Sequence, residues 1–340
     1  MSNISIPEEQ LAIQFSQTGG PEVIELKKIP VPRLADDEIL IKVEWCGINF
    51  IDTYFRSGLY PVSLPFTLGN EPAGIVVQLG AKVTGFALGD QVTTYFRGGG
   101  LQQYTCCNYL KACKIPNSVS RKEAAALCLQ GLTALTLVNE AHKVQKGEYI
   151  LVHAAAGGLG TLLCQILSNI GAHVIGTTST EEKACLAKAN GAEHVVLYAN
   201  RDVNEVISDI KKLTPRYEGV AAVFDGVGKD TWESNFEVAK RKGTIVVVGN
   251  ASGPPPSFSA LKLMAKNLKL CRPGLDQYIH TPEEWQYYTS ELFKLIAKGI
   301  VRPSYYKNEG YRFSESGVRE AHSDIASRKT TGKLIVKLVE

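Results

Sequence analysis

From residue 149 onward, short apolar runs alternate with segments of helical periodicity. The apolar runs predict buried strands at residues 149–153, 172–177, 194–197, 220–224, 243–248 and 268–271. Helices are expected between them, beginning near Gly158, Thr180, Val203, Asp230 and Ser257. Strands that are apolar on both faces need helices on both faces, so this rhythm predicts an α/β fold with a doubly wound, parallel, six-stranded sheet.

The first third of the chain has a different pattern, in which glycine and proline interrupt strand-like alternation. A strong strand is predicted over Glu38–Trp45, and a short helix between Asn49 and Gly58. Strand and turn patterns continue over Glu71–Phe96 and Leu101–Ile115. This succession is typical of a small β-barrel.

Helical signals begin where the composition changes, near residue 125. Ser120 is expected to cap a helix that starts at Arg121, and Thr133–His142 is expected to form a second helix. Near the end of the chain, Glu283–Lys298 has helical periodicity with one apolar face, and Lys333–Val339 is predicted as a last strand.

Composition adds mainly exclusions. A chain of 340 residues, 44% of them hydrophobic, can hold two domains, and a net charge of only +3 gives no reason to expect binding to nucleic acid or a membrane surface. No uninterrupted apolar run of about 18 residues is present, and the first ten residues lack the pattern of a secretory signal. The eight cysteines include no C-x-x-C pair, so we expect free thiols in the cytoplasm and no metal site.

A glycine-rich turn follows the first predicted strand of the parallel sheet. Residues 149–160 have the sequence YILVHAAAGGLG, in which Ala155 stands for the first glycine of G-x-G-x-x-G and is followed by Gly157 and Gly160. A strand, a small-residue turn and a helix in this order let backbone N–H groups approach a phosphate closely. The segment therefore predicts a dinucleotide site.

The end of the second strand indicates which dinucleotide binds. NAD-binding domains carry an acidic residue there, which accepts a hydrogen bond from the ribose 2′-OH. Here the strand ends G-T-T-S-T (176–180), whose last two residues are Ser179 and Thr180, and Lys183 lies just inside the next helix. With no acid at the strand end, the lysine and the hydroxyl groups fit a 2′-phosphate, so the sequence favours NADP(H).

Several separate segments resemble one family. NFIDTYFRSGLYP (49–61), HAAAGGLG (153–160), FDGVGKDTWE (224–233), VVGNASG (247–253) and AHSDIASR (321–328) are similar to the zinc-free quinone oxidoreductases. These form the zeta-crystallin-like branch of the medium-chain dehydrogenase/reductase superfamily. The resemblance extends over nearly the whole chain.

The resemblance implies an architecture of two domains. A GroES-like β-barrel catalytic domain would comprise residues 1–125 and 273–340, and a Rossmann domain would comprise residues 126–272. The cofactor would lie in the cleft between the domains. A homodimer would form along the last strand of the Rossmann sheet, at Leu268–Leu275.

The resemblance also assigns residues to the cofactor. The 2′-phosphate would be bound by Lys183, Tyr198 and Arg328. The ribose and pyrophosphate would contact Ser179, Gly158 and Leu159, beside Gly157 and Gly160 of the turn. The nicotinamide half would be surrounded by Asn49, Tyr54, Thr133, Gly226, Gly249 and Asn250.

The metal ligands of the zinc-dependent relatives are replaced in this chain. Asn49 stands where those relatives have cysteine, Asn70 stands where they have histidine, and the third ligand position falls near Leu129. None of these is a good zinc ligand, so zinc-assisted chemistry is not expected. Close relatives tend to have lysine where this chain has Gln130, which alters the local charge.

The implied activity is NADPH-dependent reduction of quinones of the ortho-quinone type, without zinc and by a one-electron or two-electron course. Asn49, Tyr54 and Tyr60 are the candidate catalytic residues, because an acceptor oxygen that gains charge needs hydrogen-bond donors when no metal is present. Reduction of an enal or enone double bond in the same pocket is an alternative. Binding of AU-rich RNA, as in zeta-crystallin-like proteins, is a third hypothesis that the near-neutral charge does not support.

Overall fold

The computed structural model describes residues 6–339, so part of the segment examined for a secretory signal lies outside it. The chain divides into two compact units. A β-rich unit comprises Met1–Leu129, Trp285–Phe293 and Tyr305–Glu340, and a parallel-sheet unit comprises Gln130–Glu284 and Lys294–Ser304. The domain limits predicted at residues 125 and 272 remain predictions.

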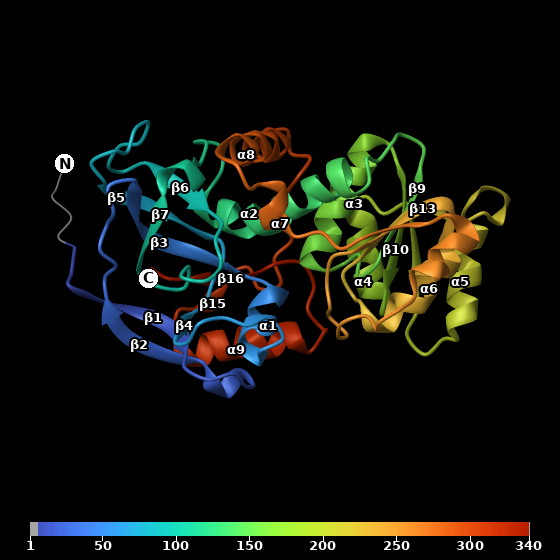
Figure 1. Ribbon diagram of the computed structural model, residues 1–340, viewed down its shortest axis with the longest axis horizontal. Helices are drawn as coiled ribbons and strands as arrows, with labels where there is room; N and C mark the ends of the chain where they lie inside the picture. The colour runs from blue at the N-terminus through green and yellow to red at the C-terminus, as the bar shows by residue number, and fades with distance from the viewer. Residues whose placement is uncertain (1–5, 340) are drawn as a thin grey trace. The chain divides into compact units, whose positions relative to one another are not determined.

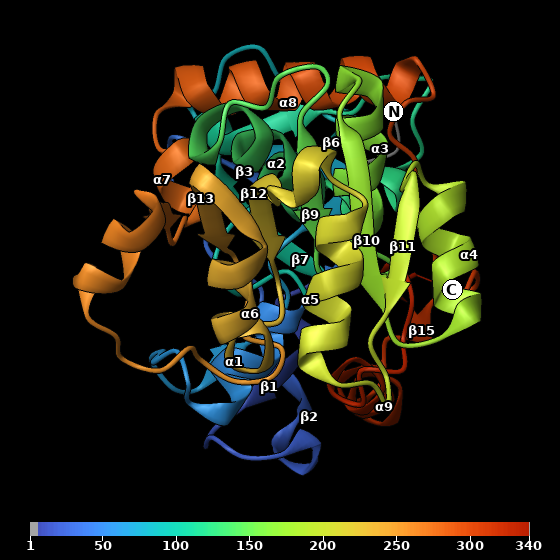
Figure 2. The same cartoon turned by 90° about the vertical axis from the view of Figure 1, so that its right-hand side faces the viewer.

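The parallel-sheet unit contains the six predicted strands. They are β9 (Tyr149–Val152), β10 (His173–Thr178), β11 (His194–Leu197), β12 (Val220–Asp225), β13 (Ala239–Val247) and β14 (Lys269–Cys271). All neighbours pair in parallel, in the order β11-β10-β9-β12-β13-β14 (Figure 2). The strand order reverses beside the central β9, which confirms the doubly wound sheet and places its topological switch point after β9.

The core of this sheet is a row of aliphatic side chains. Leu151 is paired in register with Ile175 on one side and with Val223 on the other, and Val223 is paired with Ile245. All four are fully buried. Helices connect the strands: α3 (Gly158–Ile170), α4 (Glu181–Ala189), α5 (Val203–Lys212) and α6 (Trp232–Val238). The last predicted helix, near Ser257, is instead a 3-10 helix at Ala260–Lys266.

One predicted break in a helix is wrong. The helix α2 (Arg121–Thr136) runs directly into a π-helical turn at Leu137–Ala141, so Thr133 does not begin a second helix. The hydroxyl of Thr136 donates to the carbonyl of Leu132, 3.0 Å away, one turn back in the same helix. By length and composition Arg121–Ala141 could cross a membrane, but 67% of its most apolar window is buried inside the protein, as in a core helix.

The β-rich unit contains two sheets (Figure 1). The larger has the order β15-β16-β3-β5-β6-β8, with β7 also paired to β3, and the smaller has the order β2-β1-β4. The strands are β1 (Glu9–Phe15), β2 (Glu25–Pro30), β3 (Glu38–Ile48), β4 (Phe66–Thr67), β5 (Pro72–Leu79), β6 (Gln91–Thr94), β7 (Tyr104–Asn108), β8 (Ala112–Lys114), β15 (Tyr311–Arg312) and β16 (Leu334–Lys337). Their core includes the fully buried Ile13, Ile39, Ile41 and Phe55.

The described chain also contains the helices α1 (Phe50–Ser57), α7 (Leu275–Tyr278), α8 (Pro282–Ala297) and α9 (Glu315–Ala326). Helix α1 begins after Asn49 and ends at Gly58, whose φ of 81° is the left-handed conformation that favours glycine, as the sequence predicts. Strand β16 pairs antiparallel with the end of β3, which brings Lys333 close to the start of α1.

Candidate functional site

Most residues predicted to bind the cofactor lie at one edge of the parallel sheet. The glycine-rich turn follows β9, Ser179 follows β10, Tyr198 follows β11, Gly226 follows β12, and Gly249 with Asn250 follows β13. The carboxyl ends of parallel strands lie along the same edge, so the fold brings these residues together. Thr133 lies on the part of α2 that belongs to the same unit, and it is half-buried.

The glycine-rich turn leaves room for an anion at the start of α3. Gly157 is the N-cap of this 13-residue helix, no side chain caps it, and its first turn carries no acidic residue. A Cβ on Gly160 would lie 2.3 Å from the carbonyl oxygen of Ala154, so glycine is required where the helix packs against the strand. Ala154 itself has φ of 52°, an uncommon conformation for a non-glycine residue. The turn therefore fits a pyrophosphate at a helix N-terminus.

Tyr198 directly follows β11, and Lys183 lies in the helix that follows the neighbouring strand β10. The backbone N–H of Tyr198 donates to the carbonyl of Thr178, 3.1 Å away, and Lys183 is in the first turn of α4. The hydroxyl of Thr180 caps α4 by accepting from the Lys183 N–H at 3.2 Å. The nearest acidic residues in the sequence are the exposed pair Glu181–Glu182, on the helix and not at the strand end.

A buried carboxylate shapes the turn after β12. Asp225 is fully buried and accepts hydrogen bonds from the backbone of Val227 and Gly228 and from the side chains of Thr231 and Asn235, at 2.7 to 3.1 Å. Because the Asp225 carboxylate accepts from residues on the far side of the turn, it fixes the backbone around Gly226 at the end of β12. A Cβ on Gly226 would meet no atom of the described residues within 4 Å, so space lies above it.

The three candidate catalytic residues lie together in the β-rich unit. Asn49 is the N-cap of α1, Tyr54 is inside α1, and Tyr60 follows it. The rings of Tyr54 and Tyr60 meet edge to face with centroids 5.2 Å apart, and the Tyr60 N–H donates to the Tyr54 carbonyl. Arg328 belongs to the same unit, is exposed, and has φ of 62° just after α9.

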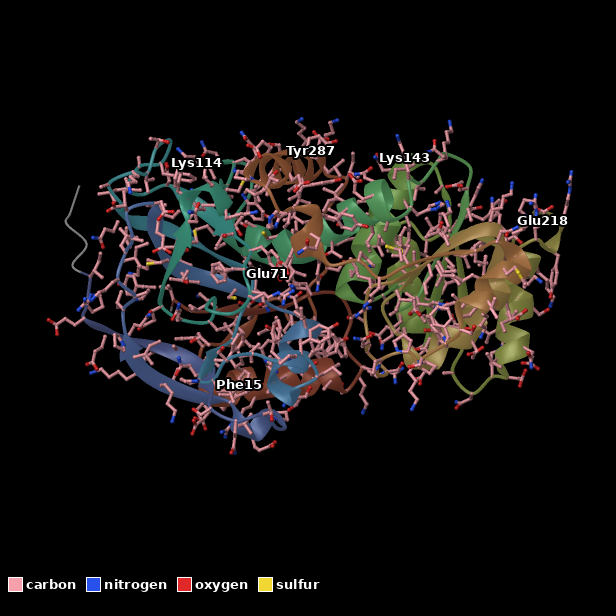
Figure 3. All side chains as sticks on the ribbon, in the orientation of Figure 1. Phe15, Glu71, Lys114, Lys143, Glu218 and Tyr287 are labelled. Atoms are coloured by element: carbon pink, nitrogen blue, oxygen red, sulfur yellow. The ribbon has the colours of Figure 1, made fainter. Side chains whose placement is uncertain are left out.

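Asn49 belongs to a buried polar network that the sequence did not reveal. Its side-chain oxygen accepts from Lys333 Nζ at 2.8 Å, and its Nδ2 donates to Glu71 Oε1 at 2.6 Å. Lys333 and Glu71 also form an ion pair, and Glu71 is fully buried. Figure 3 labels Glu71 among the side chains. On the other side, Asp52 accepts from the Asn49 backbone N–H at 2.7 Å and from Asn70 Nδ2 at 2.5 Å.

The surroundings of Asp52 raise the pKa of its carboxyl to about 7. Burial is the largest cause and Glu71 acts in the same direction, while the hydrogen bond from the Asn49 N–H and the charge of Lys333 lower the pKa. Among residues 6–339, no group of three or more His, Cys, Asp or Glu is arranged to hold a metal ion. The amides of Asn49 and Asn70 are engaged in hydrogen bonds, and an ammonium group lies beside Asn49.

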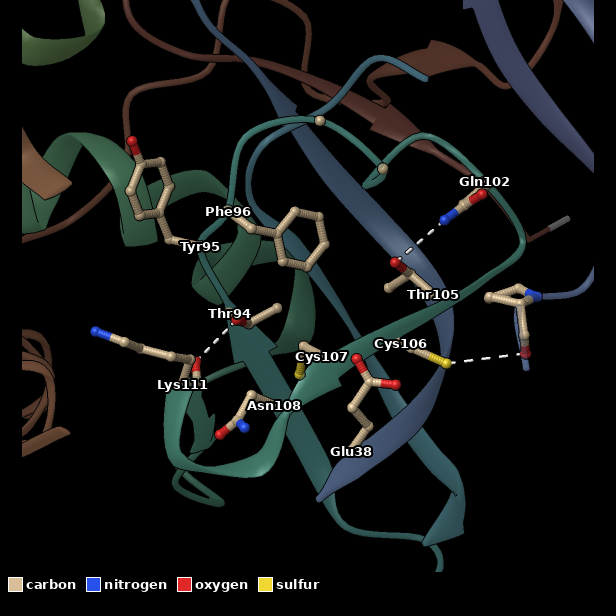
Figure 4. Close-up of a pocket in the computed structure, with 13 residues that line it drawn as sticks. Glu38, Thr94, Tyr95, Phe96, Gln102, Thr105, Cys106, Cys107, Asn108 and Lys111 are labelled. Atoms are coloured by element: carbon tan, nitrogen blue, oxygen red, sulfur yellow. Dashed lines mark hydrogen bonds between the residues drawn. The ribbon is translucent and has the colours of Figure 1, made fainter. Parts of the chain in front are cut away.

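A cavity of about 470 Å³ lies elsewhere in the β-rich unit (Figure 4). Its lining includes Phe96, Gln102, Thr105, Cys106 and Cys107 and none of the predicted cofactor or catalytic residues. Burial raises the pKa of both thiols to about 12, which disfavours the reactive thiolate. The cavity is therefore not the predicted catalytic pocket.

Comparison with known proteins agrees with this geometry. Residues 35–117 match the alcohol dehydrogenase GroES-like domain, and residues 158–294 match the zinc-binding dehydrogenase family. A GroES-like domain joined to a Rossmann-type sheet places the chain in the medium-chain dehydrogenase/reductase superfamily.

Full-length relatives narrow the assignment. The chain is 38% identical over 331 residues to a quinone oxidoreductase of Pseudomonas aeruginosa, covering 95% of this chain and 98% of that one. The crystal structure of Escherichia coli quinone oxidoreductase complexed with NADPH superposes with a TM-score of 0.91 at 36% identity, covering 96% and 100%. A 2-haloacrylate reductase of Burkholderia is 30% identical over 335 residues, covering 96% and 98%. The chain belongs to the quinone oxidoreductase family.

Proposed function

We propose that this protein is an NADPH-dependent quinone reductase that works without zinc. The observation that carries the proposal is the near-complete coverage of quinone oxidoreductases, one of which is complexed with NADPH in its crystal structure. The glycine-rich turn and the strand end that lacks an acid support the same cofactor. Localisation in the cytoplasm remains a prediction.

On this proposal the parallel-sheet unit binds most of the cofactor. Gly157–Gly160 would hold the pyrophosphate at the start of α3, and Ser179, Lys183 and Tyr198 would bind the ribose and its 2′-phosphate. Arg328 would add a guanidinium to the same phosphate. Thr133, Gly226, Gly249 and Asn250 would surround the nicotinamide half together with Asn49 and Tyr54.

The acceptor would bind beside the tyrosine pair. NADPH supplies the reducing equivalents at C4 of its nicotinamide. Tyr54 and Tyr60 would present an aromatic edge to a flat quinone, and their hydroxyls with the Asn49 amide would donate to the acceptor oxygen as it gains charge. Lys333, which donates to Asn49, is ion-paired with Glu71, so the pair holds the Asn49 amide without adding net charge to this pocket.

The test is a comparison of cofactors and acceptors. NADPH and NADH oxidation would be followed with phenanthrenequinone and, in parallel, with an enal. Turnover with NADPH and the quinone, and weak turnover with NADH, is the expected result. Equal use of NADH would contradict the role of Lys183, and tight NADPH binding without any turnover would contradict a reductase.

A conjugated double bond is the second candidate acceptor. The observation that favours it is the relative named 2-haloacrylate reductase. A polarised double bond is flat like a quinone, and the same donors would meet its carbonyl oxygen. A higher kcat/KM for the enal than for phenanthrenequinone would make this the primary activity.

We further propose a homodimer that joins two sheets along Leu268–Leu275. Strand β14 is at the end of the strand order in the described sheet, and Leu261 and Met264, just before it, are more than two-thirds exposed. Apolar residues beside an open strand edge are suited to a partner strand. Light scattering after gel filtration should give about twice the 37.0 kDa chain mass, and a strictly monomeric protein would contradict the interface. RNA binding has no added support from these features.

A further inference from the structure

The polar network around Asn49 fixes which way its side-chain amide faces. Lys333 Nζ can only donate, so the Asn49 atom 2.8 Å from it is the oxygen. The Glu71 carboxylate can only accept when ionised, so the Asn49 atom 2.6 Å from it is the nitrogen. The two contacts agree, and together they leave the Asn49 carboxamide one orientation.

The pair that holds Asn49 is itself firmly placed. Glu71 Oε2 accepts from the backbone N–H of Leu129 at 2.7 Å, while Oε1 contacts both Lys333 and Asn49. The side chains of Lys333 and Glu71 are 2% and 0% exposed. Water therefore has little access to the pair, and each of its hydrogen bonds is strengthened by the low local dielectric.

A contribution to the stability of the fold does not by itself explain why this ion pair is buried. Replacing a buried ion pair by uncharged residues of similar volume is often neutral or stabilising, because desolvation offsets the attraction. A well-packed apolar pair could not orient the amide of Asn49. Asn49 is the N-cap of α1, the helix that contains Tyr54, so its orientation also affects the position of Tyr54. A role in orientation follows from the geometry.

We propose that Lys333 and Glu71 are positioning residues for the reductase, which hold the Asn49 carboxamide with its oxygen toward Lys333 and its NH2 group toward Glu71. The proposal rests on the proposed function, in which Asn49 contacts the nicotinamide half of NADPH. The pair acts on the reaction through Asn49 and α1, without contact with the acceptor.

The first test is Glu71→Gln. The Leu129 N–H keeps the amide oxygen of the substituted side chain, so the new NH2 group faces Asn49 and Lys333. Three donors would then meet, and neither orientation of the Asn49 carboxamide satisfies both neighbours, so Asn49 loses its fixed orientation. We expect kcat to fall roughly tenfold to a hundredfold, while the Kd for NADPH stays within about threefold. The fluorescence of bound NADPH should change, because the surroundings of its nicotinamide change.

The matched control is Gln10→Met. Gln10 is 2% exposed in the same unit and forms buried hydrogen bonds with Gln102 and with the Tyr104 N–H. We expect this variant to lose thermal stability but to keep kcat within about twofold. If both variants lose kcat only in proportion to their loss of folded protein, or if Glu71→Gln keeps full kcat and unchanged NADPH fluorescence, the positioning role is refuted.

The wild-type protein provides a measurement that needs no variant to fold. The protons of the Asn49 side-chain NH2 should exchange slowly with water, because the nitrogen donates to Glu71 and the side chain is buried. Rapid exchange would refute the fixed orientation. Failure of the proposed function would look different: the wild-type protein would not oxidise NADPH with either acceptor, whereas the NH2 signals would still report the network.

Discussion

Lys333 and Glu71, 262 residues apart in the chain, form an ion pair that is almost wholly inaccessible to solvent. Lys333 immediately precedes β16, and Glu71 immediately precedes β5. Both of these strands are hydrogen-bonded to β3, one on each side. The pair thus joins the two neighbours of a central strand beside the start of α1.

Loss of one partner of this pair should cost far more stability than loss of both. Lys333→Met leaves Glu71 charged and buried without a counter-ion, and we expect the free energy of unfolding to fall by about 3–5 kcal/mol. The double variant Lys333→Met with Glu71→Gln should recover most of this loss, to within about 2 kcal/mol of the wild type. Urea unfolding measures both, and equal losses in the single and double variants would contradict a tightly coupled pair.

The Asp52 carboxyl should make stability depend on pH. Its folded pKa is raised from 3.8 to about 7, so between these values the folded state retains a proton that the unfolded state releases. That contribution is complete below the unfolded value and is lost as pH rises through the folded value. It amounts to roughly 4 kcal/mol for a difference of this size.

The variant Asp52→Asn isolates this contribution. The wild type should lose stability relative to Asp52→Asn as pH rises from about 4 to 8, and the difference should be constant above that range. Chemical denaturation at several pH values measures it. The charged and titratable groups that face Asp52 are Glu71, Lys333 and Cys46, and all three are present in both proteins. Parallel curves for the two proteins would contradict the raised pKa.

Local sequence patterns predicted the secondary-structure elements whose formation depends on residues close together in the chain. The six parallel strands, the short helix after Asn49 and the glycine that ends it follow from periodicity and from the φ angles that residue types allow. The predicted break at Thr133 was wrong because the helix, which includes Gly131, is stabilised by burial and continues without interruption.

The polar network could not be predicted in the same way. Glu71, Asp52 and Lys333 each resemble ordinary surface charges in the sequence, and their partners are distant in the chain. One signal was available in the sequence: Lys333 directly precedes the apolar run Leu334–Val336. A residue at the start of a buried strand can itself be buried, as Lys333 is. Only the pairing of β16 with β3 shows where that lysine points.

Lys183 should decide between the two nicotinamide cofactors. A hydrogen bond to a charged group contributes about 1.5–3 kcal/mol, so Lys183→Ala should raise the Kd for NADPH roughly tenfold to a hundredfold and leave that for NADH unchanged. Fluorescence titration with each cofactor measures the effect. Lys188→Ala, an exposed lysine in the last turn of the same helix, is the control and should change neither Kd. Equal weakening of NADPH and NADH would argue against a 2′-phosphate contact.

Gly226 and Gly249 offer a matched pair that separates cofactor binding from folding. A Cβ on Gly249 would lie 2.3 Å from the Gly226 carbonyl oxygen, so Gly249→Ala should reduce stability by about 1–3 kcal/mol.

A Cβ on Gly226 meets nothing within 4 Å in the described part of the chain, so Gly226→Ala should change stability by no more than about 0.5 kcal/mol. If the nicotinamide half occupies that space, Gly226→Ala should nevertheless weaken NADPH binding by about tenfold or more, since the added methyl takes a volume that the ligand needs. Thermal unfolding and NADPH titration of the two variants test this, and a Gly226→Ala protein that binds NADPH as tightly as the wild type would remove Gly226 from the cofactor site.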